Sequence, residues 1–124
     1  MTVFNAEVTP KNEIMQTMKE WLSESLGDAF DIMLPELAEM YLEDGPVLLG
    51  EIKSAIAEQD PKALKESSHA LKGSSASMGL ANLAQHCQVV ENCSKTADFA
   101  TATMKMPQVE AEFNQVISLF QEMV

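Results

Sequence analysis

Residues 60–79 read DPKALKESSHALKGSSASMG, and they hold both expected boundaries of one helix with an unusual group of side chains between them. Asp60 is a favourable N-cap residue and Pro61 suits the first helical position, so we expect a helix to begin near Pro61. Gly79 is expected to end that helix. The sequence therefore predicts one amphipathic helix with the motif SHALKGSS at its centre.

The histidine of this motif is expected to face away from the core. At about 100° per residue, five positions cluster within about 40° of one direction and form the buried stripe: Leu64, Ser68, Leu71, Ser75 and Met78. By the same count His69 lies about 140° from Leu64. It shares the outer face with Lys62, Lys65, Lys72, Gly73 and Ala76.

The rest of the chain also repeats its apolar residues at helical spacing, without sustained strand-like alternation. Further helices are expected over about 10–26, 28–44, 46–59, 80–94 and from 107 onward, with 95–106 as a connection. Pro35 should kink the second helix or delay its start, and Gly45-Pro46 should separate the second from the third. For the first two helices, the expected core positions are Ile14, Met18, Trp21, Leu22, Phe30, Met33, Leu34, Leu37, Met40 and Tyr41.

Short connections between amphipathic helices favour antiparallel neighbours. We therefore expect an all-α fold, an antiparallel up-and-down four-helix bundle with an additional short N-terminal helix. A chain of 124 residues, 46% of them hydrophobic, suits a single domain spanning 1–124.

Charge limits the choice of partners. The chain has 19 acidic residues, 8 lysines and no arginine, for a net charge of −11, which argues against nucleic acid and anionic membranes. The segment 61–95 is different, because it holds four lysines against two glutamates. His69 therefore lies in a locally basic part of an acidic protein.

Two cysteines, Cys87 and Cys93, fit neither a metal knuckle nor a disulfide framework, which favours a reducing compartment. The N-terminus lacks a signal-peptide pattern, and no apolar run is long enough to span a bilayer. These features predict a cytoplasmic protein with no membrane partner.

Three residues expected near His69 could take part in chemistry at its imidazole. Lys72 is adjacent on the helix surface and could neutralise a dianionic group on the imidazole. Gly73 lowers helix stability by up to about 1 kcal/mol relative to alanine. Close approach of another molecule to the backbone would explain why a glycine occupies this position. Counted from the turn at Gly79, Glu91 stands at nearly the height of His69 in an antiparallel hairpin, where its carboxylate could accept a hydrogen bond from one ring nitrogen.

This set of residues resembles the histidine-containing phosphotransfer (HPt) domain family. The resemblance is carried by His69-Ala-Leu-Lys72-Gly73-Ser74-Ser75, by Gly79-Leu80, by Leu83 and Glu91, and by the preceding Leu42-Glu-Asp-Gly-Pro46, and it covers about residues 27–94.

The resemblance implies that His69 is the phosphoacceptor, that Lys72, Gly73, Lys65 and Ala76 lie near the phosphoryl group or the receiver, and that Glu91 orients the imidazole. It implies a free-standing relay protein with no cofactor or metal of its own and no kinase activity. Its partners would be response-regulator receiver domains and a hybrid sensor kinase, with a monomer as the default state.

Two alternatives remain open from the residues. A helical adaptor whose histidine is never phosphorylated would use the same fold. A carboxylate-bridged metal bundle is suggested by Glu66-x-x-His69, although the pair faces outward and His86 has no glutamate three positions before it. Some methionines of the first two helices, such as Met15 or Met33, could form an apolar docking patch instead of packing in the core.

Overall fold

The computed structural model describes residues 8–124, and every regular element in that range is helical. The elements are α1 (Lys11–Leu26), the short 3-10 helix η1 (Gly27–Ala29), α2 (Phe30–Glu58), α3 (Pro61–Ser77), α4 (Ala81–Lys95) and α5 (Phe99–Gln121). The all-α prediction is thereby confirmed over the described range.

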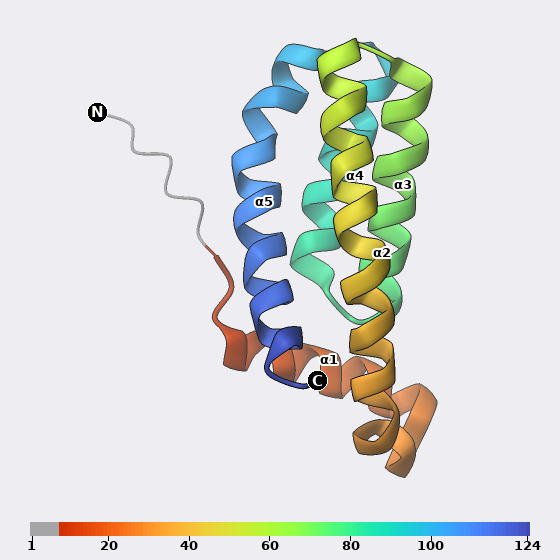
Figure 1. Cartoon of the computed structure of the whole chain (residues 1–124), viewed down its shortest axis with the longest axis vertical. Helices are drawn as coiled ribbons and strands as arrows, with labels where there is room; N and C mark the ends of the chain where they lie inside the picture. The colour runs from red at the N-terminus through yellow and green to blue at the C-terminus, as the bar shows by residue number, and fades with distance from the viewer. Residues whose placement is uncertain (1–7) are drawn as a thin grey trace, which may run out of the picture.

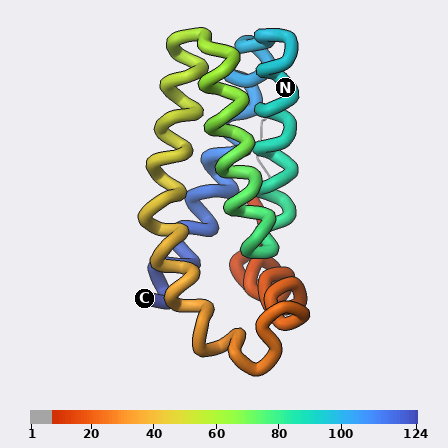
Figure 2. The backbone as a smooth tube through the Cα atoms, turned by 90° about the vertical axis from the view of Figure 1, so that its right-hand side faces the viewer, coloured from red at the N-terminus to blue at the C-terminus, as the bar shows by residue number. Residues whose placement is uncertain are grey.

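Four long helices, α2 to α5, lie side by side, and α1 lies across one end of them (Figure 1). α3 packs against α2 and α4, and α5 packs against the same two helices. The connections after α2, α3 and α4 are only two or three residues long, so each helix is followed by a close neighbour. Figure 2 shows how α1, η1 and the start of α2 form a bend below the long helices.

The helix that carries the motif begins where the sequence predicts. The side chain of Asp60 accepts a hydrogen bond from the backbone N–H of Ala63 at 3.1 Å, and Pro61 is the first helical residue. At the other end Gly79 adopts a positive φ of 77°, a conformation that glycine reaches without strain. The predicted boundaries of this helix are confirmed.

The prediction of a break at Gly45-Pro46 is wrong, because α2 is continuous through both Pro35 and Pro46. An interior proline costs about 3 kcal/mol. Both rings lie on the exposed face, where water can satisfy the carbonyl that loses its partner. The opposite face carries a buried stripe on both sides of Pro46: Phe30, Leu34, Ala38, Tyr41, Gly45, Ile52 and Ala55. Burial of this stripe offsets the proline cost.

The expected connection over 95–106 is also wrong, because α5 already begins at Phe99 and contains Pro107 in its interior. The side chain of Asp98 caps the helix by accepting from the backbone N–H of Thr101 at 3.0 Å. Ala102 and Met106 continue the buried stripe of α5 into the region that was expected to be a connection. Pro107 is again exposed.

Three residues expected in the core are exposed, namely Trp21, Met33 and Met40, with 54%, 36% and 59% of their surface accessible. Met40 lies one residue, or about 100°, from the buried Tyr41, outside the stripe that faces the bundle. In Figure 2, α1 and the start of α2 extend below the long helices, which can cover them from one side only. Their buried residues therefore form narrower stripes than the apolar arcs in the sequence. The other seven expected core residues of these helices are buried or packed against the core.

Glycine permits two close approaches in the fold. A Cβ at Gly79 would lie 2.8 Å from Trp21 Cβ and 3.2 Å from Met18 Cα, so the missing side chain lets α1 lie directly on the turn between α3 and α4. A Cβ at Gly45 would lie 3.1 Å from the ring of Phe113, so α2 and α5 also meet at a glycine.

Candidate functional site

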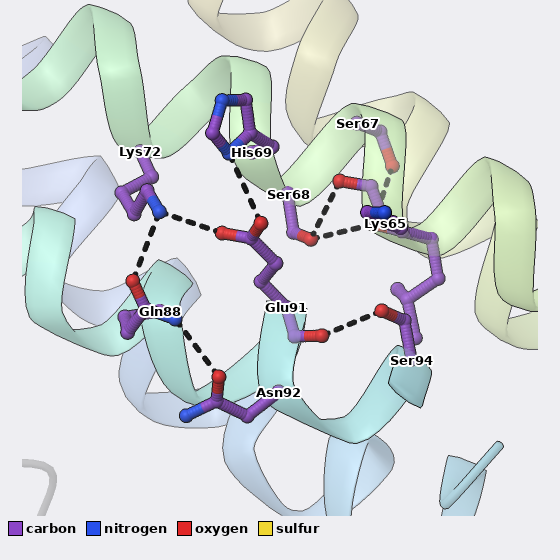
Figure 3. A network of polar contacts seen from close by, with 10 residues as sticks. Lys65, Ser67, Ser68, His69, Lys72, Gln88, Glu91, Asn92 and Ser94 are labelled. Carbon is purple, nitrogen blue, oxygen red and sulfur yellow. Dashed lines mark hydrogen bonds and ion pairs between the residues drawn. The ribbon is translucent and has the colours of Figure 1, made fainter. Parts of the chain in front are cut away.

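The site joins α3 and α4 through a contact between His69 and Glu91. Nδ1 of His69 lies 3.0 Å from Oε2 of Glu91 (Figure 3). The two side chains differ sharply in burial, since 66% of the histidine side chain but only 10% of the glutamate side chain is exposed. An exposed imidazole is therefore held from below by a nearly buried carboxylate.

This contact determines which ring nitrogen is free. An ionised carboxylate can only accept hydrogen bonds, so in the neutral imidazole Nδ1 carries the proton and donates it to Glu91. Nε2 then keeps its lone pair and faces away from the carboxylate. The arrangement leaves one exposed nucleophilic nitrogen with a fixed orientation.

Lys72 completes the polar cluster from the α3 side. Its Nζ lies 2.8 Å from Glu91 Oε1 and 2.9 Å from the amide oxygen of Gln88. Gln88 in turn donates to the side-chain oxygen of Asn92 at 2.9 Å. The two oxygens of Glu91 thus have different partners, with Lys72 at one and His69 at the other.

The environment of Glu91 keeps its carboxyl ionised. Burial alone would raise its pKa, but the hydrogen bonds from Lys72 and His69 outweigh that effect, and the pKa lies below its ordinary value. The backbone of Glu91 is also fixed, because its carbonyl accepts from the hydroxyl of Ser94 at 2.6 Å. Glu91 is therefore a rigid, negatively charged support for the imidazole.

The outer face of α3 leaves space above the site. Gly73 lies one helical turn after His69, and a Cβ placed there would meet no other atom within 4 Å. No contact in the described structure therefore explains the glycine. Lys65 and Ala76 are exposed on the same face, as the helical count predicts.

The polar cluster has two members that the sequence did not predict. Gln88 and Asn92 were not singled out, although Gln88 precedes Glu91 by three residues and Asn92 follows Gln88 by four, the spacings of neighbours on a helix. Ser75 is fully buried, and its hydroxyl lies 2.9 Å from that of Tyr41, so it serves packing between α3 and α2. Ser74 is half-buried.

The metal-bundle alternative concerns the surroundings of His69. The imidazole of His69 contacts Glu91 from the neighbouring helix. Among residues 8–124 no three His, Cys, Asp or Glu side chains gather in a way that could hold a metal ion. The same range contains no helix that has both the length and the apolar character required to cross a membrane.

Comparison with known proteins gives a consistent result. Residues 36–120 match the family model described as the Hpt domain. Among solved structures, the crystal structure of histidine-containing phosphotransfer protein B (HptB) from Pseudomonas aeruginosa PAO1 is similar, with a TM-score of 0.72 and 27% sequence identity, over 86% of this chain and 89% of that one. A comparison with curated protein sequences finds no match.

Proposed function

The chain belongs to the Hpt domain family, and we propose that His69 is the residue through which it carries a phosphoryl group from one receiver domain to another. The family match and the similarity to HptB support a phosphotransfer role in a phosphorelay. The observation that supports the assignment to His69 is its contact with Glu91, which engages Nδ1 and leaves Nε2 as the free ring nitrogen of an exposed side chain.

In the proposed reaction, Nε2 of His69 attacks the phosphorus of an aspartyl phosphate on the donor receiver. An N–P bond forms, the P–O bond to the aspartate breaks, and the aspartate leaves as a free carboxylate. No proton has to leave Nε2, because the ring proton resides on Nδ1 and stays hydrogen-bonded to Glu91. Attack by an acceptor aspartate reverses the same bond changes and restores the neutral imidazole.

The charges around the site suit each step. Attack places positive charge on the imidazole, and the ionised carboxylate of Glu91 at 3.0 Å stabilises it. The phosphoryl group then lies on the outer face of α3, where Lys65 is exposed one turn before His69. Gly73 keeps the space beside it open. Lys72 acts in this scheme chiefly through Glu91.

The proposal also covers the extent of the domain, its compartment, its oligomeric state and the source of the phosphoryl group. The chain would act as one domain over 1–124 in the cytoplasm, as a monomeric antiparallel four-helix bundle with α1 across its end. It would have no kinase activity of its own and would receive phosphoryl groups that originate in a hybrid sensor kinase. The short connections and neighbour contacts of α2 to α5 support the bundle arrangement.

The deciding experiment is incubation of the purified protein with a phosphorylated receiver domain. Wild type is expected to gain label while the receiver loses it, and His69→Gln is expected to gain none. His86→Gln is the matched control, since His86 is the other histidine and lies half-buried on α4. Equal labelling of wild type and His69→Gln would disprove the assignment. Failure of wild type to gain label from any receiver would favour the adaptor alternative.

A further inference from the structure

Lys72 contacts two acceptors on α4, and the two contacts differ in kind. Its Nζ donates a hydrogen bond to Oε1 of Gln88 at 2.9 Å and lies 2.8 Å from Oε1 of Glu91. The contact with Glu91 is short, but it lies off the direction of a well-aligned hydrogen bond. Glu91 therefore supplies the charge that attracts the ammonium group, and Gln88 supplies the directed contact that orients it (Figure 3).

An ion pair alone would hold this ammonium group loosely. The attraction between two charges depends on their distance and not on direction, and a lysine side chain carries its three N–H donors on a flexible stem. A quarter of the Lys72 side chain, 25%, is exposed, so water can reach it. Without a second acceptor the ammonium group could turn from Glu91 toward solvent. The hydrogen bond to Gln88 restricts this movement.

The position of Gln88 on α4 suits it to this task. Gln88 precedes Glu91 by three residues, so the two side chains are neighbours on the helix surface. Its amide oxygen faces Lys72, because the amide nitrogen in that place would bring two donors together. The amide nitrogen donates to Asn92, which is exposed, so water can replace that acceptor. The ammonium group of Lys72 is thus sufficient to orient the Gln88 amide.

From these contacts we propose that Gln88 is a positioning residue for phosphoryl transfer, which acts on His69 through Lys72 and Glu91. The inference rests on the proposed function. Gln88 keeps the ammonium group of Lys72 at Oε1 of Glu91, while Oε2 of the same carboxylate supports the imidazole. It takes no part in the bond changes at Nε2. Its contribution is to have the charges below the imidazole in place before the phosphoryl group arrives.

The first test replaces Gln88 with leucine, which removes the acceptor and is a good helix former. The rate of transfer from a phosphorylated receiver is measured against receiver concentration for wild type and Gln88→Leu. The rate at saturation is expected to fall about fivefold, because a hydrogen bond to a charged group is lost where water replaces it only in part. The receiver concentration for half-maximal rate should change less than about twofold, since the contact supports chemistry and not docking. Phosphoramidate, a small phosphoryl donor, should show the same fall in rate.

A double-mutant cycle then asks whether Gln88 acts through Lys72. The rate at saturation is compared for Lys72→Ala and for the protein that carries both Lys72→Ala and Gln88→Leu. If Lys72 is the only route, Gln88→Leu should change the rate of the Lys72→Ala protein by less than about twofold. A merely structural role of Gln88 would slow transfer in both backgrounds alike, and that outcome would overturn the inference.

Asn92→Ala is the matched control, because it removes the other contact of the Gln88 amide and leaves the contact with Lys72. It is expected to transfer at the wild-type rate. A fall as large as that of Gln88→Leu would contradict a role through Lys72.

Circular dichroism checks the fold of each variant, and Gln88→Ala carries the same expectation should Gln88→Leu not fold. An unchanged rate in Gln88→Leu would overturn this inference and leave the proposed function standing. If wild type accepts nothing from either donor, the proposed function itself fails, which is a different outcome from a loss confined to the variant.

Discussion

Lys72 Nζ lies 2.8 Å from Oε1 of Glu91, so the lysine of the motif is held at the carboxylate below the imidazole. The sequence suggested that this lysine would neutralise the group on His69 directly. The contact gives it a different first task, because it keeps a nearly buried Glu91 ionised and in place. Glu91 is consequently the residue that links Lys72 to His69.

Glu91→Gln is expected to slow phosphoryl transfer to His69 by about tenfold or more. The change removes a charge-assisted hydrogen bond, worth roughly 1.5–3 kcal/mol, from the imidazole that becomes positive during attack. The measurement is single-turnover transfer from a phosphorylated receiver. Asn92→Ala is the control, because Asn92 contacts Gln88 rather than His69. An unchanged rate in Glu91→Gln would remove Glu91 from the site.

The stability contributed by Glu91 is expected to depend on pH. Its pKa in the folded protein lies below the ordinary value of 4.5, so its contribution is fully present above about pH 4.5 and is lost as the pH falls through the lowered pKa. The urea midpoint of wild type should therefore exceed that of Glu91→Gln at pH 7, and the difference should shrink in acid. A difference that stays constant from pH 7 to pH 3 would contradict this.

Lys72→Ala is expected to slow transfer while the fold stays intact. Glu91 would lose the cation at Oε1 and keep only His69 as a side-chain partner. Its pKa should then rise toward its ordinary value, because one stabilising contact is gone. The rate is measured as for Glu91, with circular dichroism to check the fold and Lys95→Ala as control. Equal rates in Lys72→Ala and wild type would show that this support is dispensable.

Gly73→Ala should stabilise the protein and impair its function. A Cβ at this position meets nothing within 4 Å, so the helix should gain up to about 1 kcal/mol. The same methyl group would intrude on a receiver that approaches His69, and transfer should slow. Gly50→Ala is the matched control, because its Cβ also meets nothing, and it should stabilise without slowing transfer. Equal transfer rates in the two variants would show that no partner approaches Gly73 closely.

Gly45→Ala is expected to destabilise the fold by about 1–3 kcal/mol despite the helix propensity of alanine. The new Cβ would lie 3.1 Å from the ring of Phe113 and 3.2 Å from that of Tyr41, two buried aromatics with little room to move. Urea unfolding measures the change, again beside Gly50→Ala on the same helix. Stabilisation by both substitutions would show that α2 and α5 can separate at no cost.

Much of the site followed from the sequence because its signals are local. The cap at Asp60, the stop at Gly79 and the 100° advance per residue place His69 on an outer face without any knowledge of the partner helices. Counting along two helices from one tight turn brings Glu91 level with His69, because the turn fixes the register of the hairpin. The Nδ1–Oε2 contact at 3.0 Å agrees with that count, whereas the functional roles stay predictions.

The helical class and the hairpin of α3 and α4 could be predicted from the sequence, since periodicity, caps and turn residues act within a few positions of the chain. Other features depend on contacts between distant segments of the chain. Helix α2 continues through Pro46 because burial of its apolar face offsets the free-energy cost of an interior proline. Lys72 lies against Glu91 because a buried carboxylate needs a cation or a hydrogen-bond donor in place of the water that it has lost. Tertiary packing also leaves Trp21 exposed, because α1 crosses Gly79 and the bundle can cover only one face of α1.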